Sequence, residues 1–522
     1  MNRSAGILMS VTSLPSKYGI GCFSKEAYDF VDWLASAGQT YWQILPLGPT
    51  SYGGADDSPY QAFSAFAGNP YMICLEDLIE EGVLTKEECD AVDFGSGNVD
   101  FDKLHEHRWA LLRKAYERSN ISQDLKYQKF LEENNWWLSD YALYMALKGR
   151  FKDAGWTTWP EDIRLRYWYA LDYYRRELYF DIEYQQYMQF KFFQQWLKLK
   201  EYANGKHIQI VGDIPIYVSP DSSDVWAHPE LFQLDENNTP TAVAGCPPDA
   251  FSADGQMWGN PLYRWDYHKA TGYEWWISRL YQSFRLYDAV RIDHFRGFDE
   301  YFSIPHGSKT ALNGHWEQGP GMDLFNAVVR KLGDKQFIAE DLGHMTDTVR
   351  KLVRDSGFPN MKVIQFAFDV NDIGGANDYL PHNYGTNCVV YTGTHDNETT
   401  SGWLEDMSPE LLKTVRTYLR DEHTPVKELY HTVLAETMAT CARICIIPIQ
   451  DYLGLDNTAR MNQPGTVKKN WRWRMAAGSL TDEVRDEIIM LSKRYNRFNW
   501  ATIEKKEPEK KADEAETAAE EA

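Results

Sequence analysis

The chain has 522 residues, and its 54 Lys and Arg stand against 76 Asp and Glu, which gives a formal net charge of −22. Such an acidic balance argues against nucleic acid or an anionic membrane as a partner, because both need a basic face. The hydrophobic fraction of 43% can form a substantial core. Because a (β/α)8 barrel needs roughly 250 residues, the length fits either one barrel with large insertions or two independent domains.

The seven cysteines are odd in number and scattered along the chain: Cys22, Cys74, Cys89, Cys246, Cys388, Cys441 and Cys445. This pattern is typical of reduced thiols in a cytosolic enzyme. The first apolar run, residues 6–11, is short and broken by Ser10, so it predicts a strand and not a signal peptide. No apolar run reaches the length of a transmembrane span. We therefore expect a cytoplasmic protein without a membrane anchor.

Short apolar runs recur along the chain and predict eight strands, separated mostly by helical segments. The runs are residues 6–14, 40–46, 208–215, 289–293, 337–340, 361–368, 388–396 and 442–449. Strands that alternate with helices in this way form an α/β fold with a parallel sheet, and eight of them close into a (β/α)8 TIM barrel. We expect a catalytic barrel over residues 1–503, with large and mostly helical insertions.

Two insertions interrupt the predicted barrel. Residues 70–205 are rich in Trp and Tyr and predict a helical subdomain, which includes a long helix with an apolar stripe at i+4 spacing: Phe180, Tyr184, Met188, Phe192, Trp196 and Leu199. Residues 239–261 contain so much Gly and Pro that they predict an irregular active-site loop, with Asp249, Phe251 and Trp258 as parts of a substrate cover.

The last residues, 504–522, hold eight acids and four Lys and no core-forming face. We expect a disordered, charged tail there, with a short terminal helix as the lesser alternative.

Acidic residues stand at the ends of three of the predicted strands. Asp293 ends one strand and shares a face with Arg291, whose positive charge should keep that carboxylate ionised. Glu340 and Asp396 end two later strands. One such strand fits a structural ion pair equally well. Three of them favour a functional site, because barrel enzymes carry their catalytic groups at the C-terminal ends of several strands.

Carboxylates on one rim could bind a metal ion, or they could act as general acid, general base and nucleophile on a neutral substrate. Metal binding is less favoured, because His294 and His395 are each adjacent in sequence to an acid, and neighbours on a strand point in opposite directions. A glycosidase needs one ionised nucleophile and one protonated acid. Asp293 beside Arg291 fits the nucleophile, and Glu340 at the end of an apolar strand fits the acid.

The motifs resemble those of the amylomaltases, or 4-α-glucanotransferases, which are also called disproportionating enzymes and form glycoside hydrolase family 77 in the α-amylase clan. The resemblance rests on the strand ends Arg291–Gly297, Ala339–Gly343 and Thr394–Asn397. It extends in the family's order through Ser58-Pro59-Tyr60-Gln61, Gly212-Asp213-Ile214-Pro215, Pro247-Pro248-Asp249 and Asn470-Trp471, and it covers about residues 6–500. Cys22-Phe23-Ser24 departs from the family's pattern.

The resemblance implies a retaining double displacement on α-1,4-glucans, with transfer of the glucanosyl unit to the 4-hydroxyl of an acceptor sugar. Asp293 would be the nucleophile, Glu340 the general acid and base, and Asp396 the transition-state stabiliser. The implied substrate-binding residues are Tyr60, Asp213, Asp249, Phe251, Trp258, Arg291, His294, His395 and Asn397.

The resemblance implies no cofactor, no metal and no obligate protein partner, only a glucan donor and a sugar acceptor. Two alternatives remain open at this stage. One is a plain α-glucan hydrolase of the same clan, and the other is a catalytically inactive barrel that only binds glucan.

Overall fold

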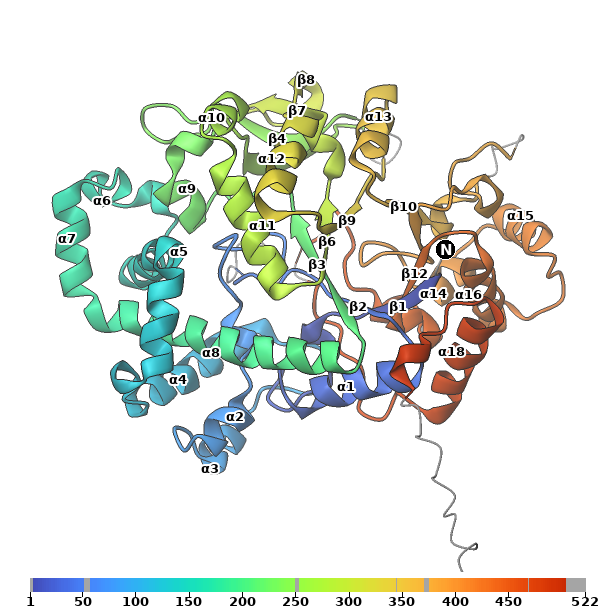
Figure 1. Ribbon diagram of the computed structural model, residues 1–522, viewed down its shortest axis with the longest axis horizontal. Coiled ribbons are helices and arrows are strands. Elements are labelled where there is room, and N and C mark those ends of the chain that lie inside the picture. Colours follow the sequence, from blue (N-terminus) through green and yellow to red (C-terminus); the bar gives the residue numbers. More distant parts are fainter. Residues whose placement is uncertain are drawn as a thin grey trace, which may run out of the picture.

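A closed barrel of eight parallel strands forms the centre of the molecule, in the order β1-β12-β11-β10-β9-β6-β3-β2. Figure 1 shows the computed structural model, which describes residues 3–50, 57–248, 253–343, 345–369, 375–467 and 469–503. The barrel strands are β1 (Ser4–Leu8), β2 (Tyr41–Gln43), β3 (Gln209–Pro215), β6 (Ala289–Asp293), β9 (Gln336–Ala339), β10 (Asn360–Val363), β11 (Cys388–Tyr391) and β12 (Ile444–Pro448). The predicted (β/α)8 barrel is confirmed, and each of the eight apolar runs supplies one strand.

The strands are apolar because helices cover the outside of the barrel and side chains fill the inside. All five residues of β12 are buried, as are the middle five of β3. Two of the predicted strands, 6–14 and 361–368, continue past β1 and β10 into 3-10 turns at the rim, Val11–Ser13 and Ile364–Phe366. These two predicted strands were therefore too long, and so were 40–46 and 388–396, because β2 ends at Gln43 and β11 at Tyr391.

Helices surround the barrel and make up the insertion between β2 and β3. They are α1 (Lys25–Ser36), α2 (Leu75–Glu80), α3 (Lys86–Asp90), α4 (Phe101–Arg118), α5 (Leu125–Arg150), α6 (Glu161–Arg164), α7 (Trp168–Glu177), α8 (Tyr179–Gly205), α9 (Ser223–Ala227), α10 (Trp265–Ala270), α11 (Glu274–Leu286), α12 (Met322–Leu332), α13 (Asp347–Ser356), α14 (Thr400–Glu405), α15 (Pro409–Leu419), α16 (Tyr430–Ala439), α17 (Ile449–Tyr452) and α18 (Asp482–Arg494). In Figure 1, α4 to α8 gather on the side opposite α14 to α18.

The long amphipathic helix predicted between residues 70 and 205 is α8. Five of the six residues in its apolar stripe, Tyr184, Met188, Phe192, Trp196 and Leu199, are buried, and they pack against the core. Phe180, in the first turn, is 68% exposed. The stripe is therefore a packing surface, whereas the division into a barrel domain and an inserted subdomain stays a prediction.

The segment 239–261 is not the irregular loop that its Gly and Pro content predicted. It forms β4 (Ala242–Cys246) and β5 (Gln256–Pro261), two antiparallel strands of a four-stranded sheet with the order β5-β4-β7-β8. The partner strand β7 (Glu300–Pro305) comes some sixty residues later and pairs Ala244 with Ser303, and β8 (His315–Gln318) follows it. Local sequence cannot reveal such a partner, because β propensity depends mainly on tertiary packing.

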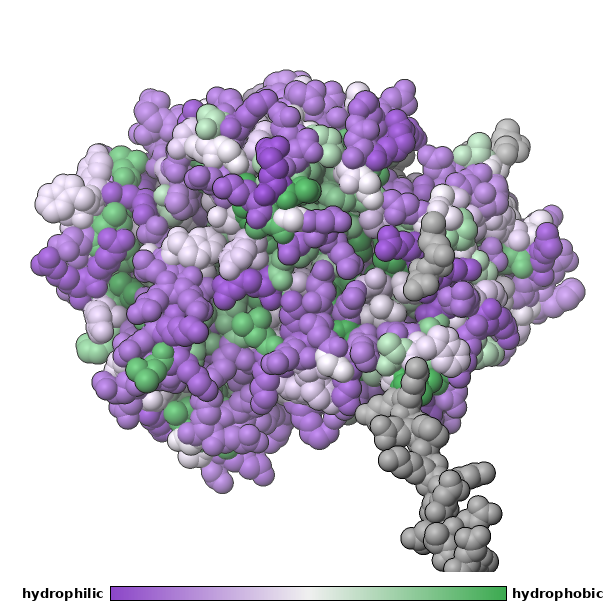
Figure 2. All heavy atoms as spheres, in the orientation of Figure 1, coloured by the Kyte–Doolittle hydropathy of each residue, from purple (hydrophilic) through white to green (hydrophobic). Residues whose placement is uncertain are grey.

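Within the described ranges, the structure contains no helix that is both long and apolar enough to cross a lipid bilayer. Figure 2 shows hydrophilic side chains over most of one face, with hydrophobic groups scattered among them. The tail at residues 504–522 lies outside the described residues.

Gly212 in β3 allows the Tyr287 ring to lie directly against the barrel strand. A Cβ atom at this position would come within 2.2 Å of two atoms of that ring. Gly212 also directly precedes Asp213, which the candidate site uses, so the close packing fixes the strand beside a functional residue.

We predict that Gly212→Ala destabilises the protein by about 1–3 kcal/mol, because the added methyl group overpacks a filled core. Thermal unfolding followed by circular dichroism measures the loss. Gly149→Ala in α5 is the matched control, since nothing lies within 4 Å of a Cβ there. If both variants unfold at the same temperature, the close packing against Tyr287 does not exclude a larger side chain at residue 212.

Candidate active site

The three acids singled out from the sequence lie at the C-terminal ends of three barrel strands. Asp293 is the last residue of β6, Glu340 directly follows β9, and Asp396 lies in the loop after β11. Strands β6 and β9 are neighbours, with Ile292 in register with Ala339. The acids interact electrostatically, because Asp293 raises the pKa of Glu340 and Asp396 raises that of Asp293. The fold therefore brings the three together at one rim.

A buried guanidinium organises the centre of the site. Arg291 Nη1 donates to both carboxylate oxygens of Asp213, at 2.8 and 2.7 Å, and Nη2 donates to Asp293 Oδ1 at 2.9 Å. The side chains of Arg291 and Asp213 are only 4% and 0% exposed. Burial alone lowers the pKa of Arg291, but the charges of Asp213 and Asp293 raise it well above its ordinary value. Arg291 is therefore a permanent cation shared by two carboxylates.

The effect of this cation on Asp293 is weaker than the sequence suggested. Burial raises the pKa of Asp293 above its ordinary value, Arg291 lowers it, and Asp213 and Asp396 raise it further. The expectation that Arg291 would control this carboxylate was incomplete, because neither the desolvation nor the charge of Asp213 on β3 can be read from the local sequence.

Glu340 is the acid with the strongly perturbed pKa. Burial and then the negative charge of Asp293 raise its pKa to about 8, although two backbone N–H groups oppose the shift. These groups belong to Leu342, which donates to Oε1 at 2.7 Å, and to His294, which donates to Oε2 at 2.6 Å. The predicted raised pKa of Glu340 is confirmed, so this residue holds a proton at neutral pH.

We predict that the stability of the protein falls as the pH rises from about 4.5 to about 8, the ordinary and native pKa values of Glu340. In this window the native state holds a proton that the unfolded chain has lost. The free energy of unfolding therefore falls by up to about 1.4 kcal/mol for each pH unit. Glu340→Gln cannot lose that proton. The unfolding temperature of the variant minus that of the wild type should therefore be more positive at pH 9 than at pH 6.

Glu106→Gln, in which the original side chain is 75% exposed, controls for the loss of one surface carboxylate. An equal difference between Glu340→Gln and the wild type at both pH values would contradict a raised pKa at Glu340.

Aromatic rings from three segments pack beside Asp213. The hydroxyl of Tyr60 donates to Asp213 Oδ2 at 2.8 Å, and the Tyr60 ring stacks on His395 with 5.1 Å between centroids. Trp471 lies 5.7 Å from Tyr60 and 5.8 Å from His395. Burial and Asp213 raise the pKa of Tyr60 well above its usual value, so its hydroxyl remains a donor. The structure thus brings Tyr60 and His395, two of the predicted substrate-binding residues, together beside Asp213, and it adds Trp471, which was predicted only as part of the family motif.

A second aromatic group lies beside Asp293. Trp258 on β5 meets the His294 ring edge-on at 4.9 Å, and Tyr217 lies 6.3 Å from Trp258. Burial and the nearby Arg296 lower the pKa of His294 to about 3, so its imidazole is neutral. His294 Nε2 is buried and has no hydrogen-bond partner among the described atoms. This nitrogen is therefore an unsatisfied polar atom beside Asp293.

Asp396 is held by a loop that the sequence analysis did not single out. Asn462 Nδ2 donates to Asp396 Oδ1 at 2.7 Å, and Arg460 donates to the backbone oxygen of Asp396 at 2.6 Å. Asn397 uses its side-chain oxygen to accept from the backbone N–H of Thr394 at 2.9 Å, which closes the turn. Nothing in the local sequence around Asn462 marks this contact, because it depends on how the loop after β12 packs.

Asp249 and Phe251, which were predicted to cover the substrate, lie outside the described residues. Trp258 is described and half-buried beside His294. The structure therefore places one of the three predicted cover residues at the site.

The chain matches the model of a protein family described as 4-alpha-glucanotransferase over residues 9–481. It is 47% identical over 495 residues to the 4-alpha-glucanotransferase of Clostridium butyricum, covering 94% of this chain and 100% of that one. The 4-alpha-glucanotransferase of Thermus thermophilus is 44% identical, covering 92% and 96%. Among solved structures, the amylomaltase of Streptococcus agalactiae, determined in complex with acarbose, is similar at a TM-score of 0.91 and 42% identity, covering 95% and 100%.

Proposed function

The chain belongs to the 4-alpha-glucanotransferase family, and we propose that it carries out this transfer by a retaining double displacement on Asp293 and Glu340. Its substrates would be maltooligosaccharides and amylose. The observation that carries the proposal is that two interacting carboxyls lie in different environments. Asp293 is hydrogen-bonded to a cation, and Glu340 has a pKa of about 8. A glycosidase mechanism of this kind requires such a pair.

In the first step Asp293 attacks the anomeric carbon of the donor glucan while Glu340 gives its proton to the departing glycosidic oxygen. The shortened glucan leaves, and a β-linked glucosyl ester remains on Asp293. The ester no longer carries the negative charge with which Asp293 had paired Arg291. Asp213 Oδ2, which accepts from Arg291 Nη1 at 2.7 Å, still neutralises the guanidinium. This second carboxylate keeps the buried cation paired through the whole cycle.

In the second step Glu340, now ionised, takes the proton from the 4-hydroxyl of the acceptor, which attacks the ester carbon and restores the α linkage. The backbone N–H groups of His294 and Leu342 hold the Glu340 carboxylate during this exchange. We assign Asp396 to the sugar hydroxyls at the cleavage point, since its side chain is 46% exposed and Asn462 orients it.

The remaining predicted residues would bind the sugars. His294 offers a neutral ring nitrogen, and Tyr60, His395 and Trp258 offer aromatic surface against which sugar C–H groups pack. Asp213 and Arg291 would act mainly by fixing Asp293. Asp249, Phe251 and Asn397 are assigned to the same subsites from the family resemblance alone.

We further propose a cytoplasmic location, which the free cysteines among the described residues support. We also propose that the enzyme needs only its glucan donor and sugar acceptor. The comparisons favour transfer over the hydrolase alternative, because the relatives reported above bear transferase names.

We predict that Asp293→Asn lowers turnover by several powers of ten, because the amide cannot form the covalent intermediate. Folding and maltooligosaccharide binding should survive, since Asn keeps an oxygen that accepts from Arg291. Initial rates measure the loss of turnover, and isothermal titration calorimetry measures the binding of maltooligosaccharide. Asp288→Asn, just before the start of the same strand, is the matched control and should keep its activity. Retention of more than a few per cent of activity in Asp293→Asn would refute the nucleophile.

We predict that maltotriose yields glucose and a ladder of longer maltodextrins, with little gain in reducing ends. Water is present at roughly 55 M, so a transferase must exclude it and bind its acceptor well. Trp258→Ala opens the surface beside His294 and should raise the share of hydrolysis, whereas Trp168→Ala, which removes an 80% exposed ring on α7, should not. Glucose and reducing-end assays run together measure the ratio. Equal rates of glucose and reducing-end release by the wild type would make the protein a hydrolase.

A further inference from the structure

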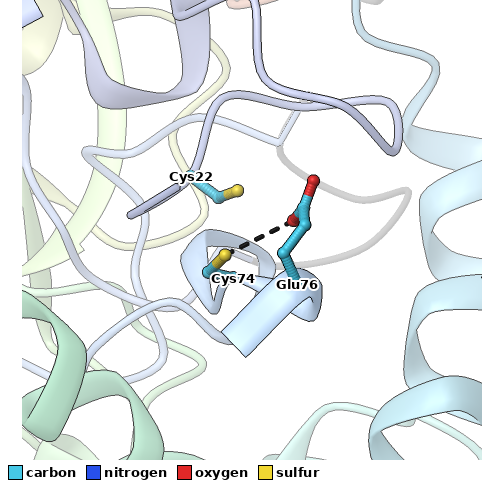
Figure 3. Close-up of side chains that lie close together, drawn as sticks. All are labelled: Cys22, Cys74 and Glu76. Carbon is cyan, nitrogen blue, oxygen red and sulfur yellow. Dashed lines mark hydrogen bonds between the residues drawn. The ribbon is translucent and has the colours of Figure 1, made fainter. Parts of the chain in front are cut away.

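Two cysteines and a glutamate meet in the interior, in a cluster that shares no residue with the candidate active site. Figure 3 shows Cys22, from the loop after β1, beside Cys74 and Glu76, at the start of α2. Their sulfur atoms and a carboxylate oxygen all lie within 4.8 Å of one another. Cys74 Sγ donates to Glu76 Oε2 at 3.3 Å. Cys22 and Cys74 are only 3% and 1% exposed, so the two thiols form a buried pair.

Backbone contacts hold the two cysteines in place independently of their side chains. The N–H of Phe23 donates to the carbonyl oxygen of Met72 at 3.1 Å, which joins the two segments. Gln195 on α8 accepts from the N–H of Cys74 at 2.7 Å and donates to its carbonyl oxygen at 3.3 Å. The sulfur atoms are therefore kept close by the fold itself.

A buried cation lies beside the pair. Arg108 on α4 is 0% exposed and donates to the carbonyl oxygens of Tyr18 and Ile73. Across the described part of the chain its guanidinium forms no ion pair with a carboxylate, and its Nε has no hydrogen-bond acceptor. A buried cation is costly unless an anion accompanies it. A Cys22 thiolate would supply that anion.

The acid–base balance of the pair agrees with this geometry. The hydrogen bond with Cys74 and the charge of Arg108 lower the pKa of Cys22, although burial and the negative charge of Glu76 oppose the shift. The same hydrogen bond and burial raise the pKa of Cys74. The two shifts run in opposite directions, so Cys22 is the more easily deprotonated of the two sulfurs and the better nucleophile.

We infer that Cys22 and Cys74 form a redox-active thiol pair that a small peroxide converts reversibly into a disulfide, a property beyond the transferase activity. The Cys22 thiolate attacks one oxygen of hydrogen peroxide, and protonation of the other oxygen releases water and leaves a sulfenic acid. The Cys74 thiol then displaces hydroxide from that sulfur, which leaves as a second water with the Cys74 proton. The two sulfurs lose two electrons in total, and the peroxide gains them.

Metal binding is the competing use of the same atoms, and the structure favours oxidation. A structural zinc site has four protein ligands, whereas this cluster offers three among the described residues. A divalent cation would also lie next to Arg108, whose charge acts directly on Cys22. Repulsion between the two cations would weaken metal binding, while the same guanidinium stabilises the thiolate that oxidation needs.

The position of Arg108 makes the disulfide easy to reduce. Oxidation would remove the thiolate form that the charge of Arg108 stabilises, so the reduced pair is favoured. Disulfides whose reduced form is stabilised in this way are strong oxidants and behave as labile switches. The cross-link would tie the loop after β1 to the segment that leads from Tyr60 into α2.

Peptide mapping of the full-length protein tests the inference directly. Trypsin cleaves after Lys17, Lys25 and Lys86, which places Cys22, Cys74 and Cys89 on three different peptides. The reduced, metal-free protein is treated with a small molar excess of hydrogen peroxide, blocked with N-ethylmaleimide and digested. We expect a cross-linked peptide that joins Cys22 to Cys74 and disappears after incubation with glutathione.

Cys89 is the internal control, since it is fully buried and burial raises its pKa to about 11. It should remain a free thiol, and Cys22→Ser should abolish the cross-link and leave Cys74 unoxidised. Two results would overturn the inference. One is oxidation of Cys89 as fast as Cys22 without any cross-link in the wild type. The other is stoichiometric zinc, measured by mass spectrometry after dialysis against zinc alone, that is lost in Cys22→Ser.

Discussion

The candidate site depends on one buried ion pair, between Arg291 and Asp213. Strands β3 and β6 lie in register so that these two residues are direct partners, and Asp293 is two residues further along β6. Removing one member of a buried pair leaves an uncompensated charge, which typically costs 3–5 kcal/mol. The pair is therefore a constraint on the barrel as well as on the chemistry. Tyr60 is fixed through Asp213, and Tyr60 in turn positions the His395 ring.

Glu340 lies in a different environment, in which burial and the negative charge of Asp293 outweigh the charge of Arg291 and raise the pKa of its carboxyl. Among the described residues, two backbone N–H groups donate to its carboxyl, and one of them belongs to His294, the residue that follows Asp293. His294 has a positive φ of 57°, a conformation that is uncommon for a residue with a side chain. The turn after β6, which follows Asp293 directly, therefore also holds the Glu340 carboxyl at the end of the neighbouring strand.

The eight strands and the rim position of the acids could be predicted because barrel strands are continuous apolar runs and their C-terminal ends share one rim. Strands β4, β5, β7 and β8 could not, since their residues are partly polar and their pairing is long-range. The contact from Asn462 to Asp396 was missed for the same reason. The pKa of Asp293 was judged from Arg291 alone, because burial and the approach of Asp213 exist only in the folded chain.

Closure of the barrel by β1 and β12 has a consequence for how the protein is made. These strands come from opposite ends of the chain and pair from Ser4↔Ile444 to Leu8↔Pro448. A nascent chain leaves the ribosome from its N-terminus, so β1 can pair with β2 early, but the barrel cannot close until β12 has been made. Trp471 and Asn462, which complete the site, emerge later still. A nascent chain that stops before β12 therefore has no closed barrel, and one that stops before Trp471 lacks part of the assembled site.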